Sequence, residues 1–241
     1  MSLAGGLLFY FVLGLTVIPL SLLLLLSIPF TSRADRYDMI RAWGRLMLTV
    51  LRRTCGISTR VLGMENCPAS SAVVLSKHQS AWECFWLGCE LPFRCAYVYK
   101  ESLNRIPFFG WALWSVGLLG IDRSNGRGAF QTFATKGVSF LRQGWGVVIF
   151  PEGTRVAPGS HVKYKSGGAR LAVMAGVPVV PVALNSGLVW PKNSIAKRPG
   201  VVTVSIGRPI ETRGRSAREV NEEAEAWIEA ESTRLLRSGR N

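Results

Sequence analysis

The feature that most constrains this chain is a run of uncharged, mostly apolar residues near its start, from 3 to 30. A helix needs about 20 apolar residues to cross the ~30 Å hydrocarbon core of a bilayer, so the run predicts a membrane-embedded helical segment. A cleaved signal peptide is disfavoured, because no basic stretch precedes the run, the run is too long and no A-x-A site follows it. Pro19 favours a kink, so a bent, half-inserted hairpin stays open beside a single crossing.

A cluster of arginines follows the apolar run and comprises Arg33, Arg36, Arg41, Arg45, Arg52 and Arg53. Basic residues that flank a membrane segment stay in the cytoplasm, so we expect this flank on the cytoplasmic face of the membrane. Within residues 36–53 apolar side chains recur at helical spacing opposite the arginines, which is typical of a helix at the headgroup level. The same pattern also fits a helix that packs on a protein core. We predict residues 1–57 as a membrane anchor with an interfacial helix, and residues 58–241 as a separate α/β domain.

From residue 58 onward, short β-rich runs alternate with helical stretches. The β-rich runs are 58–62, 72–75, 95–98, 146–150, 179–183 and 201–206. The helical stretches are 81–90, 106–116, 128–142, 168–175 and 216–236. This alternation predicts an α/β fold with a mostly parallel or mixed twisted sheet flanked by helices. In the last helix Ser216 and Glu219 have capping-box spacing, and its apolar face is expected to dock on the sheet.

Composition narrows the function classes. The 241 residues carry a net charge of +14, which favours anionic partners such as phospholipid headgroups, phosphorylated substrates or nucleic acid. The sequence contains no nucleic-acid-binding motif, so we do not expect nucleic acid as a partner. The five cysteines are odd in number and form no CxxC pair, so we expect reduced thiols and no metal site.

The candidate catalytic residues follow the predicted strand 72–75, in the run SKHQSAWE at 76–83. His78 falls in the turn after the strand, where the functional groups of α/β folds gather. The His78 ring can fold back toward the carboxylate of Glu83, which would fix the tautomer and free the other ring nitrogen to take a proton. Two alternatives stay open from spacing alone: Glu83 caps the helix together with Ser80, and His78 is a structural loop histidine.

Three further blocks follow predicted apolar elements: GIDR at 120–123, FPEGTR at 150–155 and VPVVPVALNSG at 177–187. Arg155 offers a planar guanidinium that suits phosphate oxygens. The alternative is a surface turn in which Glu152 and Arg155 pair. Taken alone, the block 177–187 predicts only a strand entered by a rigid turn.

In this order and with these separations, the four blocks resemble those of the glycerolipid acyltransferases, specifically the bacterial 1-acylglycerol-3-phosphate (lysophosphatidate) acyltransferases. The resemblance covers residues 30–210. It implies transfer of a fatty acyl group from acyl-CoA or acyl carrier protein to the sn-2 hydroxyl of 1-acylglycerol-3-phosphate, which makes phosphatidic acid without a cofactor. Glu83 departs from the family's usual His-x4-Asp pattern, and Gly120 and Val156 stand where Phe and Ser are frequent.

The resemblance also implies residue roles. His78 is the general base and Glu83 orients it. The residues implied at the acceptor phosphate are Lys100, Arg123, Glu152, Gly153, Thr154 and Arg155. Backbone N–H groups around Gly153 are candidates for stabilising the oxyanion. Cys84 should face away from the dyad, because neighbours on a helix point about 100° apart.

The acyl chain needs an apolar groove, and candidate lining residues are Trp111, Leu113, Trp114 and Leu118, which could equally be core. Two other functions remain as alternatives. One is an acyltransferase for another lysolipid acceptor, such as lyso-ornithine lipid. The other is a non-enzymatic, basic membrane-anchored protein that binds membrane lipids or nucleic acid.

Overall fold

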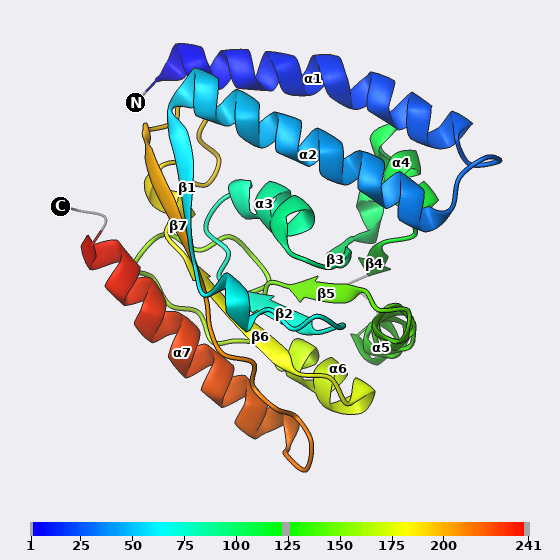
Figure 1. Cartoon of the computed structure of the whole chain (residues 1–241), viewed down its shortest axis with the longest axis vertical. Helices are drawn as coiled ribbons and strands as arrows, with labels where there is room; N and C mark the ends of the chain where they lie inside the picture. The colour runs from blue at the N-terminus through cyan, green and yellow to red at the C-terminus, as the bar shows by residue number, and fades with distance from the viewer. Residues whose placement is uncertain (1, 122–125, 239–241) are drawn as a thin grey trace.

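A seven-stranded sheet between layers of helices forms the centre of the computed structural model, which describes residues 2–121 and 126–238 (Figure 1). The strands are β1 (Ile57–Leu62), β2 (Val73–Ser76), β3 (Cys95–Lys100), β4 (Leu119–Ile121), β5 (Gly146–Ile149), β6 (Val179–Leu184) and β7 (Gly200–Ile206). The α-helices are α1 (Leu3–Leu26), α2 (Arg33–Cys55), α3 (Trp82–Glu90), α4 (Phe109–Val116), α5 (Gly126–Arg142), α6 (Gly167–Ala175) and α7 (Ala217–Ser238). Short 3₁₀ turns are η1 (Met64–Asn66), η2 (Glu101–Arg105) and η3 (Ser186–Leu188).

The sheet is mixed, as predicted. Its strand order is β1-β7-β6-β2-β5-β3-β4, and every neighbouring pair is parallel except β6 with β7. The central strands β2 and β6 are buried along their whole length, which explains why they read as continuous apolar runs. Because β2, β5 and β3 are parallel neighbours, the turns that follow their carboxyl ends gather at one edge of the sheet.

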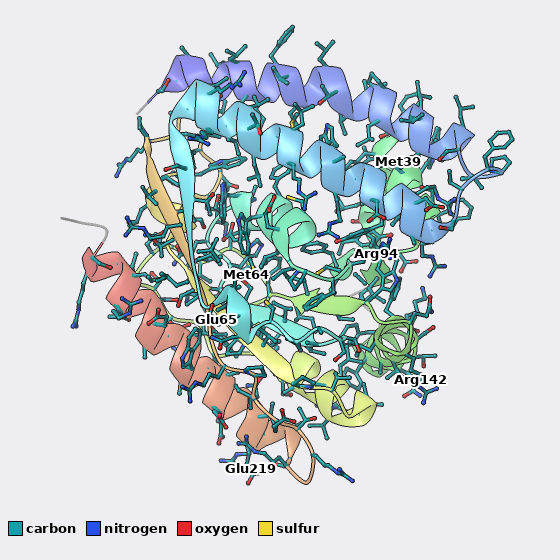
Figure 2. The ribbon with its side chains drawn as sticks, in the orientation of Figure 1. Met39, Met64, Glu65, Arg94, Arg142 and Glu219 are labelled. Carbon is teal, nitrogen blue, oxygen red and sulfur yellow. The ribbon has the colours of Figure 1, made fainter. Side chains whose placement is uncertain are left out.

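Helices cover both faces of the sheet (Figure 1). The helix α3 and the long helix α2 lie on one side, and α6 and α7 lie on the other. Figure 2 shows side chains filling the space between these layers and the sheet. At the start of α7 the Ser216 hydroxyl receives the Glu219 N–H at 3.2 Å, and the Glu219 carboxylate accepts the Ser216 N–H at 2.8 Å, so the predicted capping box is confirmed.

The N-terminal helices α1 and α2 form an antiparallel hairpin across the top of the fold (Figure 1). The chain runs through Pro19 as one helix and turns back only after Leu26, where a capping box at Ser32 starts α2. Of the described helices, α1 alone is long and apolar enough to cross a membrane, and only 17% of its most apolar window is buried. The apolar face of α2 packs on protein, with Met47 and Leu51 fully buried, which favours the core-packing alternative for residues 36–53.

An aromatic cluster around a fully buried lysine ties α1 to the loop that precedes β7. The Lys197 ammonium lies 4.3 Å from the ring centroids of Tyr10 and Trp190 and 5.0 Å from that of Phe9. It also donates to the carbonyl of Ile195 at 3.1 Å. Cation–π attraction of this kind strengthens when the cation is desolvated, and burial lowers the pKa of Lys197. This contact is independent of the apolar packing along the rest of α1.

Two element boundaries differ from the sequence prediction. The helix expected at 106–116 starts only at Phe109, because Phe108 has φ of 60°, a left-handed conformation that a helix cannot contain. The three-residue strand β4 was not predicted, since it is a short apolar run between two longer apolar elements. The other predicted strands and helices are confirmed to within a few residues.

Candidate active site

His78 is fixed at the carboxyl end of β2 by contacts to two other segments. Its backbone N–H donates to Oε2 of Glu152 at 2.8 Å, and its carbonyl accepts the N–H of Val156 at the same distance. Its ring stacks on Phe150, with centroids 3.9 Å apart and planes inclined by 16°. The side chain is 16% exposed. The turn after β2 therefore presents one partly accessible imidazole, and the turn after β5 holds it there.

Glu83 ties down the turn before α3 and also lies close to the His78 ring. Its fully buried carboxylate accepts the N–H of Gln79 at 2.5 Å and that of Ser80 at 2.8 Å, so it ties down the turn before α3. Its Oε1 also lies 3.8 Å from Nδ1 of His78, which is longer than a hydrogen bond. That nitrogen is buried and has no hydrogen-bond partner. A small rotation of the ring toward Glu83 would satisfy Nδ1 and leave Nε2 free to act as a base.

Glu152 belongs to the FPEGTR motif but does not point at an open anion site. Its Oε2 accepts the His78 N–H, and its Oε1 lies 2.7 Å from the buried ammonium of Lys77. Burial raises the pKa of Glu152, and the neighbouring Lys77 opposes that rise. A buried carboxylate with these partners holds the histidine turn in place. It is not suited to binding phosphate, because two anions repel each other.

The rest of that motif forms a turn surrounded by cations. Gly153 has φ of 73°, and a Cβ built on it would lie 2.9 Å from the ammonium of Lys165. The Lys192 ammonium lies 3.0 Å from the carbonyl of Arg155 and 3.4 Å from the hydroxyl of Thr154, which is exposed. The Arg155 guanidinium donates to Oδ1 of Asn193 at 3.3 Å.

Three cations thus meet at this turn, from Arg155, Lys165 and Lys192. Within the described part of the chain none of the three forms an ion pair with a carboxylate, so the pairing of Glu152 with Arg155 that the sequence left open as an alternative does not occur. Sequence reasoning missed Lys165 and Lys192, because neither belongs to a motif and only the fold brings them to the turn. Arg123 lies outside the described residues, and so does the side chain of Lys100, whose backbone ends β3.

The fourth block, which predicted only a strand, also supports the histidine turn. The Gly187 N–H donates to the side-chain carbonyl of Gln79 at 3.1 Å. A Cβ at Gly187 would lie 3.0 Å from Cβ of Gln79 and 2.7 Å from Pro158, so a larger residue would push these segments apart. Because β6 pairs with β2, the end of β6 is placed directly beside the turn that it supports.

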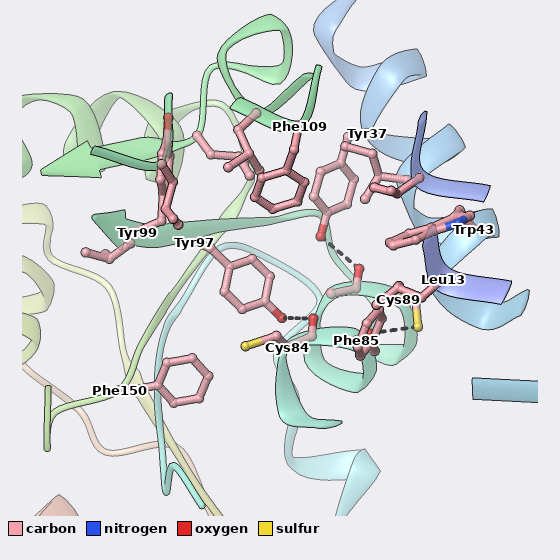
Figure 3. A pocket seen from close by; sticks show the side chains of 18 of the residues that line it. Leu13, Tyr37, Trp43, Cys84, Phe85, Cys89, Tyr97, Tyr99, Phe109 and Phe150 are labelled. Carbon is pink, nitrogen blue, oxygen red and sulfur yellow. Dashed lines mark hydrogen bonds between the residues drawn. The ribbon is translucent and has the colours of Figure 1, made fainter. Parts of the chain in front are cut away.

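An apolar cavity of about 730 Å³ opens beside His78 (Figure 3). Its walls come from α1, α2, α3, β3 and α4, and the labelled rings of Tyr37, Tyr97, Phe109 and Phe150 surround the hollow. Tyr97 and Tyr37 donate their hydroxyls to the carbonyls of Cys84 and Gly88, at 3.1 and 2.8 Å, so polar atoms in the wall are satisfied. A cavity of this size and polarity suits a hydrocarbon chain.

The predicted groove residues divide between this cavity and the surface. Leu113 and Leu118 line the cavity, whereas Trp111 and Trp114 are 48% and 67% exposed on the outside of α4. The prediction that Cys84 faces away from the dyad is wrong, since it lines the same cavity as His78. The Cys84 side chain is open to the cavity, but desolvation by the surrounding protein raises the pKa of its thiol to about 12, with Glu83 adding to the rise. The thiol therefore stays protonated and weakly nucleophilic near neutral pH.

The arrangement can perform proton transfer next to a bound chain. The imidazole lines an apolar cavity, and Gly153 of the cationic turn lines the same cavity. No three His, Cys, Asp or Glu side chains of residues 2–121 and 126–238 come together as a metal site requires.

Comparison with known proteins agrees with this geometry. Residues 58–185 match the family model "Acyltransferase". A 1-acyl-sn-glycerol-3-phosphate acyltransferase of Pseudomonas aeruginosa is 42% identical over 83% of this chain and 78% of its own length. A protein of the same name from Saccharomyces cerevisiae is 32% identical over 75% of this chain and 61% of its own length.

The whole fold, including the hairpin of α1 and α2, also has a solved counterpart. The crystal structure of the 1-acyl-sn-glycerophosphate (LPA) acyltransferase PlsC of Thermotoga maritima superimposes with a TM-score of 0.76 and 25% identity. The superposition covers 96% of this chain and 94% of that protein. The histidine motif, the FPEGTR turn and nearly all the strands lie inside the region that the family model matches, and this chain belongs to the acyltransferase family.

Proposed function

We propose that this protein transfers a fatty acyl group to the free hydroxyl of 1-acylglycerol-3-phosphate and so makes phosphatidic acid. The observation that carries the proposal is that His78 lines an apolar cavity whose wall also includes Gly153, in the turn where three cations meet that have no carboxylate partner among the described residues. An acyl chain fits the cavity and a phosphate fits the turn. The names of the Pseudomonas and yeast relatives describe the same acceptor.

In the proposed reaction Nε2 of His78 takes the proton of the acceptor's sn-2 hydroxyl, with Glu83 behind the ring to stabilise the imidazolium. The alkoxide oxygen attacks the thioester carbonyl and forms a tetrahedral oxyanion. The carbon–sulfur bond then breaks, the thiolate leaves, and the imidazolium returns its proton to the sulfur. The products are 1,2-diacylglycerol-3-phosphate and the free thiol, and the enzyme is unchanged.

The oxyanion needs N–H donors close to the reacting carbon. The N–H of Gly153 already donates to the carbonyl of Phe150 at 3.0 Å, so it is a poor candidate. The N–H groups of Thr154 and Arg155 come next in the same turn, and we assign the oxyanion to them.

The acceptor phosphate binds to the cations of the FPEGTR turn. Arg155 provides a planar pair of donors that matches two phosphate oxygens. Lys165 and Lys192 add positive charge from outside the motif, and Lys100 and Arg123 complete the set that the family resemblance implies. In this proposal Glu152 positions His78 and does not contact the phosphate.

The substrates reach the site from the bilayer. The outer surface of α1 exposes a long series of apolar side chains, among them Phe11, Leu15 and Leu26, which are 66%, 62% and 73% exposed. Because α1 packs lengthwise on the catalytic part, we place it in the leaflet next to the domain rather than across both leaflets. The exposed arginines at the end of α2, Arg52 and Arg53, then face the headgroups on the cytoplasmic side of the inner membrane. The acyl donor is acyl-CoA or acyl carrier protein.

The test is acyl transfer to 1-acylglycerol-3-phosphate by purified protein in phospholipid vesicles, with each donor offered separately. We expect activity in the wild type and a loss of roughly 10³-fold in His78→Ala, as for removal of a general base. The matched control is His161→Ala, because His161 is 55% exposed and pairs with Glu225 on the far side of the sheet. An active His78→Ala variant would overturn the mechanism, and an inactive wild type would redirect the search to other lysolipid acceptors.

A further inference from the structure

The side chain of Lys77, the residue directly before the candidate base, is almost completely buried, with 1% exposed. Its ammonium lies 2.7 Å from Oε1 of Glu152, 2.7 Å from Oε1 of Glu229 and 3.4 Å from the carbonyl of Ser160. The ammonium donates hydrogen bonds to Glu229 and Ser160 and forms a buried ion pair with Glu152. An unpaired buried ammonium would be costly, and the two carboxylates offset that cost for Lys77.

Glu229 comes from α7, which is distant in sequence from the four motif blocks. It lies beyond the region matched by the acyltransferase family model, which ends at residue 185. The Tyr164 hydroxyl donates to the same Oε1 of Glu229 at 2.7 Å, and burial, followed by Glu229, raises the pKa of Tyr164 well above its ordinary value. Tyr164 therefore remains a hydroxyl donor and holds the Glu229 carboxylate toward Lys77.

These contacts form one continuous chain from α7 to the imidazole. Glu229 holds the Lys77 ammonium, that ammonium holds Oε1 of Glu152, and Oε2 of Glu152 holds the N–H of His78. Lys77 and His78 are also consecutive residues, so the position of one limits the other. Contacts from both faces of the sheet therefore hold the turn after β2: Glu229 of α7 acts from one face, and Glu83 of α3 acts from the other (Figure 1).

We infer that Glu229 is a positioning residue for the acyl transfer proposed above: it keeps Lys77 and Glu152 in the geometry that fixes His78. The inference rests on the proposed function, because it concerns the efficiency of the His78 base. Glu229 touches neither substrate, and so its loss should lower kcat and leave the KM of both substrates nearly unchanged.

The neighbouring residue Glu225 supplies a matched control. It lies one helical turn earlier on the same side of α7, and it pairs with the exposed His161 at 2.8 Å rather than with Lys77. Glu229→Gln and Glu225→Gln remove the same charge from the same helix face. Only the first of them interrupts the chain of contacts to His78.

The experiment compares kcat and KM of wild type, Glu229→Gln, Glu225→Gln and Lys77→Met in the vesicle assay. We expect Glu229→Gln to lower kcat about tenfold with KM within about twofold, which corresponds to the weakening of one charge-assisted contact. Glu225→Gln should match wild type. Since Lys77 and Glu229 act as one unit, the double variant should lose no more than Lys77→Met alone.

The pH dependence of kcat/KM distinguishes a positioning role of Glu229 from a decrease in the amount of folded protein. The carboxylates near His78 are Glu83 from α3 and Glu152 from the turn after β5, and Lys77 and Glu229 lie behind the latter. The cations of the same turn, Arg155, Lys165 and Lys192, are unchanged in every variant. Removing the Glu229 charge makes this surrounding less negative, so the imidazolium is less stabilised. The acid limb of kcat/KM should move to lower pH by several tenths of a unit, whereas a smaller folded fraction would leave the limb in place.

Each outcome decides a different point. The activity of the wild type is measured before that of any variant, and an inactive wild type overturns the proposed function. With an active wild type, equal kcat values for Glu229→Gln and Glu225→Gln would refute the positioning role. If Glu229→Gln does not fold, Tyr164→Phe replaces it, because that change keeps the ring and removes only the hydroxyl that orients Glu229. A kcat for Tyr164→Phe equal to that of wild type would refute the inference as well.

Discussion

The cavity beside His78 predicts that one residue of α1 sets the length of the transferred chain. Gly14 lines the cavity together with Tyr10, Leu13 and Val17, which lie on the same side of α1. A Cβ built on Gly14 meets no other atom within 4 Å, so a larger side chain has space to enter the cavity. Gly14→Leu should therefore fold normally and occupy volume that an acyl chain would otherwise fill.

The size of the effect follows from burial of methylene groups. Each buried methylene contributes ~0.8 kcal/mol, which is about fourfold in kcat/KM. A leucine side chain that displaces about two methylenes from the cavity therefore disfavours a chain two carbons longer by ~1.6 kcal/mol, or about 15-fold. The total activity with shorter chains should change little, because His78 and the cationic turn are untouched.

The assay measures kcat/KM for palmitoyl and myristoyl thioesters with one fixed acceptor. For Gly14→Leu we expect the palmitoyl-to-myristoyl ratio to fall about 15-fold relative to wild type. Leu15→Phe is the control, because Leu15 is 62% exposed on the outer surface of α1 and adds bulk outside the cavity. A folded Gly14→Leu variant with an unchanged ratio would refute the placement of the transferred chain against α1. If Gly14→Leu instead changes the preference for the length of the acceptor's own acyl chain, and not that of the donor, the acceptor chain occupies the cavity.

Further predictions concern the dyad, the phosphate site and stability. Glu83→Gln keeps an acceptor for the turn but removes the charge behind the imidazole, so kcat should fall ~10²-fold in the vesicle assay while the fold, followed by circular dichroism, persists. Arg155→Ala should raise the KM of the phosphate acceptor about tenfold and leave the KM of the acyl donor unchanged, and equal shifts in both would argue against a phosphate contact. The neighbouring Arg234 holds the pKa of the Glu231 carboxyl below its ordinary value. The stability that this carboxylate contributes is therefore present above the ordinary pKa and is lost as the pH falls through the lowered pKa. The urea concentration at the midpoint of unfolding should therefore change less between neutral and acidic pH in Glu231→Gln than in wild type.

The α/β pattern of the domain could be predicted because local signals and tertiary structure agree there. The runs that became β2 and β6 are apolar throughout, as buried parallel strands require, and Ser216 with Glu219 marks the start of α7. The start of α4 could not be predicted, because the conformation of Phe108 depends on the turn around Pro107 rather than on apolar spacing.

The candidate site was predictable only where its residues are close in sequence. His78, Glu83 and Arg155 lie in recognisable blocks, so sequence spacing pointed to them. The roles of Glu83 as both cap and neighbour of the ring needed coordinates, since one spacing fits both. Lys165, Lys192 and Glu229 join the site through the fold alone, and a single sequence carries no signal that links them to it.

The aromatic cluster around Lys197 has a consequence for anyone who wishes to handle this enzyme in plain buffer. Deleting α1 looks like a simple way to obtain a water-soluble fragment. It would strip Phe9 and Tyr10 from the ammonium of Lys197 and leave Trp190 exposed to solvent. It would also remove one wall of the cavity beside His78. Solubility is better sought by replacing outward residues such as Phe11 and Leu15 with polar ones, which keeps the inner surface of α1 intact.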